Sequence, residues 1–201
     1  MAENQRVRLS KQLLRQSLID LLNDKSIHKI SVREICDRAQ VNRSTFYKYY
    51  GSQYDLFKEM EDEVLEHVDR HLSVKPTTVA GDLSQITELI AFVEDNAPLS
   101  RILINHNIDP TFPDALMNLP CLRQWIDNHF RAVYSKAEME YVYALVVSGG
   151  YSIIKMWINK DDREPPELIA ALVCGTIAKL FPETDTSCKQ PAAHSHERRK
   201  G

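Results

Sequence analysis

The chain has 201 residues, of which 43% are hydrophobic and 26% are charged. This is the composition of an ordinary globular protein, and it excludes a collagen, a coiled-coil rod and a wholly disordered polymer. Its six glycines are too few for the phosphate-binding loops and tight hairpins that are common in sheet-containing proteins. The composition therefore favours an all-α fold.

The sequence carries no recognisable signal for membrane insertion or export. No run approaches the roughly 18 consecutive apolar residues of a membrane span, and residues 1–12 lack the apolar core of a signal peptide. Its cysteines form no CxxC pair and no zinc-like spacing; they are Cys36, Cys121, Cys174 and Cys188. We therefore expect a cytoplasmic protein with reduced thiols and no membrane partner.

The formal net charge of −3 conceals an uneven distribution. Residues 1–51 contain ten Lys and Arg against five Asp and Glu, a balance of +5, which leaves 15 against 23, a balance of −8, for residues 52–201. A basic first quarter indicates an anionic partner for that part of the chain, and nucleic acid is the commonest one. A solvated helical face would show the same bias, so charge alone leaves both interpretations open.

Hydrophobic spacing predicts four helices in the first third of the chain. Ser31 and Glu34 form the pattern of a capping box at the start of the second helix. Asn42 is placed to cap the third helix, and Gly51 is placed to end it. The predicted helices cover residues 10–23, 31–39, 43–50 and 53–72.

The remaining helices are predicted at residues 83–96, 98–106, 119–134, 136–157 and 165–181. Prolines make residues 110–120 a bent region, with Asn118 placed to cap the helix that follows. Ser135 and Glu138 form a second capping box, which begins a helix so apolar that we expect it to be buried nearly all round. We therefore expect about nine helices in total.

These elements suggest two domains and a tail. Residues 8–68 are predicted to form a three-helix DNA-binding domain, with a helix-turn-helix motif at about residues 31–50. Residues 69–182 are predicted to form a second, larger helical domain. Residues 183–201 are polar and predicted to be disordered.

The third predicted helix has two chemically different faces. Phe46 and Tyr50 are four residues apart and share a face with Val41, so they can pack on the preceding helices. The opposite face carries groups that suit guanine edges and phosphates: Arg43, Ser44, Tyr47 and Lys48. A helical hairpin with a merely solvated polar face remains the alternative.

Residues 9–65 resemble the DNA-binding domain of the tetracycline-repressor (TetR) family of bacterial transcription regulators. The residues that carry this resemblance are 30–39, 41–50 and 51–56, above all Thr45-Phe46-Tyr47 followed by a basic residue and two aromatic residues. The resemblance implies a homodimer that binds double-stranded DNA at a (pseudo)palindromic operator, as a repressor released by a small-molecule effector of unknown identity. The alternative is a helical adaptor or coactivator controlled by a protein partner.

The resemblance also implies roles for individual residues. Asn42 would cap the recognition helix, and Lys48 would reach either bases or phosphates. The full set expected at the DNA is Ser31, Asn42, Arg43, Ser44, Thr45, Tyr47, Lys48 and Tyr49, with Arg43 and Ser44 facing bases and Thr45, Tyr47 and Tyr49 holding phosphates.

Two residues depart from the family pattern. Gln40 stands where the family usually has glycine in the turn, which predicts slightly different backbone angles because glycine's freedom at positive φ is missing. Gln53 stands where the family usually has lysine. Its presence removes one phosphate contact and predicts weaker DNA binding at high salt.

The C-terminal part resembles a subgroup of the family that includes an activator of dihydroxyacetone metabolism, at residues 148–151, 155–158 and 166–168. The resemblance implies that residues 69–182 form a ligand-binding and dimerisation domain, in which the last two helices build a four-helix dimer interface with those of the partner. The residues that we assign to this interface are Gly149, Gly150, Ile153, Trp157, Leu168 and Leu172. The two glycines would let a neighbouring helix approach closely, and a local kink is the alternative.

An effector pocket with aromatic walls and a few polar atoms is also predicted. Its residues are Phe92, Leu103, His106, Trp125, His129, Tyr141 and Tyr151, although each could instead be an ordinary core residue. The sequence has no Gly-rich phosphate loop and no nucleophile elbow, so we expect neither an enzyme nor a cofactor.

Glu63, His67 and His71 lie four residues apart on one helical face, which is a spacing that can bind a metal ion. The surrounding segment is acidic and suited to solvent. Exposed helices carry such triplets by chance, so we predict no metal there.

Overall fold

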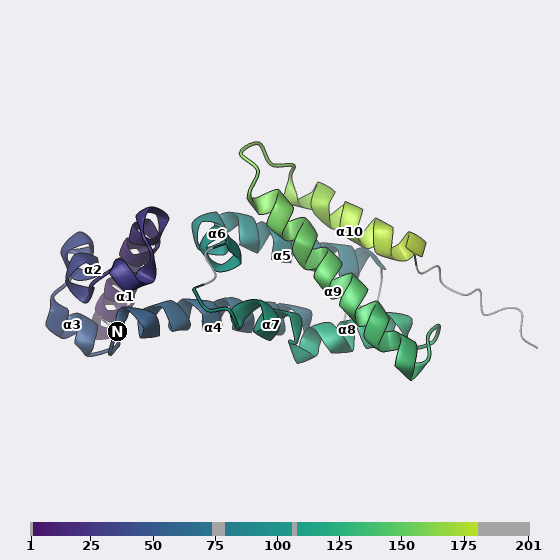
Figure 1. The fold of residues 1–201 in the computed structure, drawn as a ribbon, viewed down its shortest axis with the longest axis horizontal. Helices are drawn as coiled ribbons and strands as arrows, with labels where there is room; N and C mark the ends of the chain where they lie inside the picture. The colour runs from purple at the N-terminus through teal and green to yellow at the C-terminus, as the bar shows by residue number, and fades with distance from the viewer. Residues whose placement is uncertain (1, 74–78, 106–107, 181–201) are drawn as a thin grey trace, which may run out of the picture.

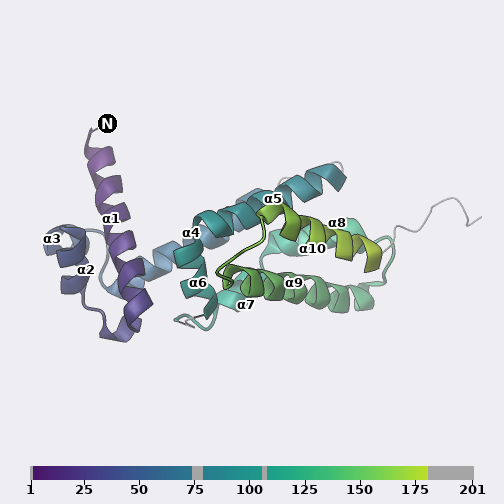
Figure 2. The same ribbon diagram turned by 90° about the horizontal axis from the view of Figure 1, so that it is seen from above.

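The computed structural model describes residues 2–73, 79–105 and 108–180. Within these ranges the chain forms ten α-helices, one 3-10 helix and no strand, so the predicted all-α fold is confirmed. The molecule is elongated, with a head of three helices at one end and a larger helical body at the other (Figures 1 and 2). A long helix, α4, runs from the head into the body.

The head is built from α1 (Ala2–Asp24), η1 (Ile27–Lys29), α2 (Val32–Ala39) and α3 (Arg43–Tyr47). The predicted capping box is present, with Ser31 accepting a hydrogen bond from the Glu34 amide and the Glu34 carboxylate accepting one from the Ser31 amide. Helical hydrogen bonding continues beyond α3, since the Tyr50 amide donates to the Phe46 carbonyl at 3.0 Å. The prediction that the Asn42 side chain caps α3 is wrong. Asn42 occupies the N-cap position, but its side chain makes no capping hydrogen bond.

The turn between α2 and α3 differs from expectation. Gln40 has φ 53° and ψ 39°, which is the left-handed conformation that favours glycine. The prediction of different backbone angles is therefore wrong: the turn keeps the glycine-type geometry with a side chain in place. This geometry lets the Val41 amide donate to the Cys36 carbonyl at 3.0 Å and so ends α2.

Helix α4 (Gln53–Leu72) begins with a capping box formed by Ser52 and Asp55. Its first half packs on the head through buried Leu56, Phe57 and Met60. The same hydrophobic core includes Leu99, Ile102 and Leu103 of α6 and Phe112 of α7. The head core therefore continues into the body.

The body consists of α5 (Val79–Asp95), α6 (Ala97–Asn105), α7 (Phe112–Met117), α8 (Pro120–Phe130), α9 (Lys136–Ile158) and α10 (Pro166–Leu180). Helix α7 was not predicted, because the three prolines of residues 110–120 indicate a bent region, whereas Pro113 lies in the first turn of this helix. Asn118 does not cap α8: it ends α7, and its side-chain amide donates to the Asp114 carbonyl at 2.8 Å. The tail predicted to be disordered lies outside the described residues.

Helix α9 starts at the predicted capping box of Ser135 and Glu138. The expectation that α9 is buried nearly all round is wrong, since Tyr141, Leu145 and Met156 are 78%, 58% and 69% exposed. Among the described helices, α9 is also the one that is long and apolar enough to span a membrane by length and composition. These two properties do not distinguish a membrane span from a helix whose apolar face a partner covers.

Candidate nucleic-acid interface and ligand cavity

Helix α3 has the two faces that its sequence predicts. Phe46 is fully buried and Tyr50 is nearly so, and both belong to the head core. Arg43, Ser44 and Lys48 are exposed. The Tyr47 side chain, 58% exposed, extends the same outer surface. The inner face thus fixes the helix, and the outer face presents a guanidinium, an ammonium and hydroxyl groups to solvent.

Most other cations of the head are neutralised within the chain. The ion pairs are Lys11–Glu59 at 2.6 Å, Arg15–Glu63 at 2.5 Å, Lys25–Glu34 at 2.5 Å, Arg33–Asp37 at 3.4 Å and Arg38–Asp20 at 3.2 Å. The Lys25 ammonium, with further hydrogen bonds from Ser31, lowers the pKa of the Glu34 carboxyl to about 2. Arg43 and Lys48, by contrast, have no ion-pair partner among the described residues. Positive charge is therefore left available on α3.

The other residues expected at the DNA differ in their exposure and contacts. Thr45 and Tyr49 are half-buried, and the Lys48 ammonium lies 5.6 Å from the centre of the Tyr49 ring. Ser31 is exposed, although its hydroxyl is already engaged in the cap of α2. Sequence reasoning missed a neighbouring exposed pair, in which the Tyr54 hydroxyl lies 2.6 Å from Nδ1 of His28.

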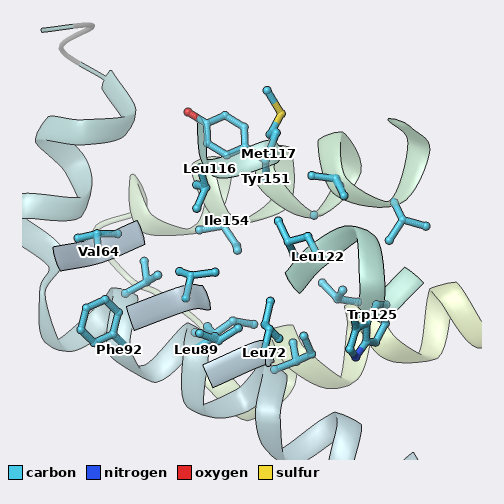
Figure 3. A pocket seen from close by; sticks show the side chains of 18 of the residues that line it. Val64, Leu72, Leu89, Phe92, Leu116, Met117, Leu122, Trp125, Tyr151 and Ile154 are labelled. Atoms are coloured by element: carbon cyan, nitrogen blue, oxygen red, sulfur yellow. The ribbon is translucent and has the colours of Figure 1, made fainter. Parts of the chain in front are cut away.

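A cavity of about 210 Å³ lies in the body. It is enclosed by side chains from every helix between α4 and α10, among them Val64 and Leu72 of α4, Leu122 of α8 and Ile154 of α9 (Figure 3). Because α4 also packs in the head core, one helix contacts both the cavity and the DNA-binding head.

Four of the residues predicted for the pocket line this cavity, namely Phe92, Leu103, Trp125 and Tyr151. His106 lies outside the described residues. The assignment of Tyr141 to the pocket is wrong, because its side chain is 78% exposed and does not line the cavity. The assignment of His129 to the pocket is wrong as well, because His129 does not line the cavity; its ring lies against that of Trp125, with the centroids 4.2 Å apart.

His129 joins α8 to α5 instead. Its Nε2 lies 3.0 Å from the Asp82 carboxylate, and its Nδ1 lies 2.7 Å from the Trp125 carbonyl. The Trp125 indole donates to the other oxygen of Asp82 at 3.3 Å. Asp82 therefore holds the rings of Trp125 and His129 in place.

The three residues considered for a metal do not converge. The Glu63 carboxylate is paired with Arg15, the His71 ring lies 3.1 Å from the Glu88 carboxylate, and the His67 ring stacks on Phe92 with centroids 3.7 Å apart. Among the described residues, no group of three metal-binding side chains was found.

The residues assigned to a dimer interface fall into two groups. Leu168 and Leu172 are each 52% exposed on α10, and a Cβ added at Gly149 would meet no atom within 4 Å. The assignment of Trp157 to the interface is wrong, because Trp157 is 1% exposed and its indole donates to the Glu164 carbonyl of its own chain at 2.8 Å. Gly150 lines the cavity, and Ile153 is half-buried against the core.

Two family models match the chain. Residues 17–60 match the model described as bacterial regulatory proteins of the tetR family, and residues 83–179 match a transcriptional regulator C-terminal region. The chain belongs to the TetR family of transcriptional regulators. It is therefore a DNA-binding regulator and not an enzyme.

A curated relative supports this TetR assignment. The HTH-type transcriptional regulator YxbF of Bacillus subtilis (strain 168) is 26% identical over 189 residues, which cover 83% of this chain and 44% of the relative. The chain thus spans less than half the length of that relative, and YxbF is itself uncharacterised.

Solved structures of other TetR proteins share the fold. A regulator from Streptococcus agalactiae 2603V has a TM-score of 0.62 at 20% identity, with 88% of this chain and 98% of that chain covered. The dihydroxyacetone kinase operon activator DhaS has a TM-score of 0.59 at 18% identity, with coverages of 86% and 96%. At these identities the likeness establishes the fold alone.

Proposed function

We propose that this TetR-family protein is a cytoplasmic homodimer that binds a pseudopalindromic operator through α3 and represses transcription until a small molecule releases it. The observation that carries the proposal is the pair Arg43 and Lys48: both are exposed, neither has a carboxylate partner among the described residues, and the opposite face of their helix packs in the head core. In a helix-turn-helix, the second helix enters the major groove. Arginine suits guanine edges there, and lysine suits phosphates.

The remaining contacts follow from the position of each residue on this surface. Arg43 and Ser44 are proposed to face bases at the start of α3. The phosphate backbone is proposed to be positioned by Ser31, Asn42, Thr45, Tyr47 and Tyr49. Lys48 follows the end of α3, where its ammonium can reach a phosphate.

The proposed dimer uses the exposed apolar surface of α9 and α10. This surface consists of Tyr141, Leu145, Met156, Leu168 and Leu172, each more than half exposed in a single chain. Large apolar side chains that are exposed on two long helices favour burial against a second copy. The open space beside Gly149 would allow close approach of the partner's helix.

Release by an effector is proposed to act through α4 and α6. Val64 and Leu72 of α4 and Leu103 of α6 line the cavity, while α4 and α6 also contribute to the head core. A ligand that fits the cavity better at one head spacing would shift the equilibrium by its differential affinity, typically about 1–3 kcal/mol.

The DNA-binding proposal is tested by fluorescence anisotropy with DNA from the chain's own upstream region, at a series of salt concentrations. We expect a steep fall in affinity with salt. The variant Arg43→Ala/Lys48→Ala should lose affinity and lower the log–log salt slope by about one per protomer, because Lys48 is the proposed phosphate contact of the pair. The matched control, Lys25→Ala/Arg38→Ala, removes the same charge from residues paired within the chain and should retain binding. Equal effects of both variants would contradict the assignment of α3.

The dimer is tested by sedimentation of Leu172→Glu, which would bury an unpaired charge at the proposed interface. We expect a monomer whose circular dichroism remains helical. Leu83→Glu is the matched control, because Leu83 is a 36% exposed leucine of α5 outside this surface. A Leu172→Glu protein that stays dimeric would place the interface elsewhere.

A further inference from the structure

The chemistry of the cavity restricts what it can hold. No Asp, Glu, Lys, Arg or His occurs among the described residues that line it. Most of the wall is aliphatic, and the aromatic rings of Phe92, Trp125 and Tyr151 are set around it (Figure 3). A charged group placed inside would lose its hydration without gaining an ionic partner.

The few polar groups of the wall are committed or neutral. The Ser100 hydroxyl donates to the Val93 carbonyl at 3.1 Å, and the Trp125 indole donates to Asp82. Two groups remain, the Tyr151 hydroxyl and the Cys174 thiol. Burial raises the pKa of both, so both are uncharged at neutral pH. The wall therefore offers a ligand only neutral hydrogen bonds.

We propose that the cavity binds an uncharged and largely hydrocarbon molecule with one or two rings, and that it excludes carboxylates, phosphates and organic cations. This inference rests on the proposed function, because it names the class of the effector. The size follows from the volume: a cavity of about 150 Å³ accommodates benzene, and this one measures about 210 Å³. The aromatic side chains of the wall suit a flat ring system, which they can meet face-on or edge-on.

Gly150 provides a way to fill the cavity without disturbing the backbone. It lines the cavity, and a Cβ added there would meet no atom within 4 Å. A leucine at this position would therefore extend into open space, and it would also favour the helix more than glycine does. Ala137 lies exposed in the first turn of the same helix and outside the cavity, so Ala137→Leu is a control that enlarges a side chain elsewhere on α9.

The test is isothermal titration calorimetry on the DNA-free protein with two matched probes, naphthalene and 2-naphthoate, at pH 7.5. We expect naphthalene to bind at least tenfold more tightly than 2-naphthoate. Its affinity should fall at least tenfold in Gly150→Leu and stay unchanged in Ala137→Leu. Equal binding of the two probes, or unchanged binding by Gly150→Leu, would overturn the proposal. If Gly150→Leu fails to fold by circular dichroism, Val147→Phe fills the cavity from the next residue of the lining.

A second measurement separates this inference from the proposed function. Anisotropy with upstream DNA is repeated in saturating naphthalene. Release of DNA supports both proposals. Selective naphthalene binding without any change in DNA affinity supports the ligand class and contradicts effector release through this cavity. DNA binding that persists in a protein with no affinity for naphthalene overturns the ligand class alone.

Discussion

Glu61 of α4 carries a buried carboxylate at the junction between the head and the body. Glu61 is 1% exposed, and one of its carboxylate oxygens has no hydrogen-bond partner within the described part of the chain. The other oxygen lies 3.5 Å from the Lys58 ammonium. Burial, reinforced by the neighbouring Asp109 carboxylate, raises the pKa of Glu61 from 4.5 to about 7, against the opposing effect of Lys58. We predict that Glu61→Gln stabilises the fold above neutral pH.

The magnitude follows from linkage. The difference between a pKa of 4.5 unfolded and about 7 folded makes the charged form cost about 3 kcal/mol in the folded state, at about 1.4 kcal/mol per pH unit. Because the pKa is raised, the protonated form stabilises the fold at low pH, and this stabilisation is lost as pH rises through 7. The Glu61 contribution should therefore differ by about 2 kcal/mol between pH 5.5 and pH 8. The glutamine variant should lack this difference.

Urea unfolding of the parent and of Glu61→Gln, each at pH 5.5, 7 and 8, measures the effect. Subtracting the two free energies of unfolding at each pH removes the contributions of the other titrating groups. Asp62→Asn is the matched control, since Asp62 also lies near Lys58, at 3.4 Å, but is 54% exposed. It should leave the pH dependence intact. Parallel pH profiles for the parent and Glu61→Gln would refute the reasoning.

Three further changes test the local structure by urea unfolding. Gln40→Gly should raise the free energy of unfolding by about 1 kcal/mol, because glycine adopts the left-handed conformation of this position without strain. A lower free energy of unfolding would show that the glutamine side chain contributes contacts of its own. Asp55→Ala should lower the free energy of unfolding by about 1 kcal/mol, because Asp55 accepts hydrogen bonds from the Gly51 and Ser52 amides at 2.8 and 3.1 Å. An unchanged free energy would show that this cap does not stabilise the fold. Arg101→Met should lower the free energy of unfolding by about 2 kcal/mol, because Arg101 donates to the Ile158 carbonyl at 2.8 Å; a loss below about 0.5 kcal/mol would assign that bond no net stabilisation.

The parts of the fold that could be predicted are those specified by local chemistry. The capping boxes at Ser31 and Ser135 involve residues three apart, so the sequence alone places both partners. The inner face of α3 is likewise predictable, because Phe46 and Tyr50 are the large apolar residues at helical spacing within an otherwise polar segment. Which cations of the head are left without an ion-pair partner could be predicted only in part. That Arg38 pairs with Asp20, 18 positions away, depends on how α2 packs against α1.

Helix α9 shows where periodicity stops being informative. Apolar residues occur nearly all round it, so no polar stripe indicates which side faces solvent. Tyr141 was consequently assigned to the cavity and lies on the exposed face, whereas Trp157 was assigned to that face and lies in the core. The distinction depends on neighbours distant in sequence: α9 packs on α6 and α8, and those contacts select the buried side.

Glu61 makes the same point for charge. In the sequence it is one of several acidic residues on α4, next to Asp62 and Glu63, and nothing local separates the three. In the structure Asp62 and Glu63 are exposed while Glu61 is buried, because the segment that carries Asp109 packs against this part of α4. Helical geometry places a residue on a face, but only tertiary packing determines whether that face retains its water. The one α4 carboxylate with a raised pKa therefore lies at the point where the head core continues into the cavity-bearing body.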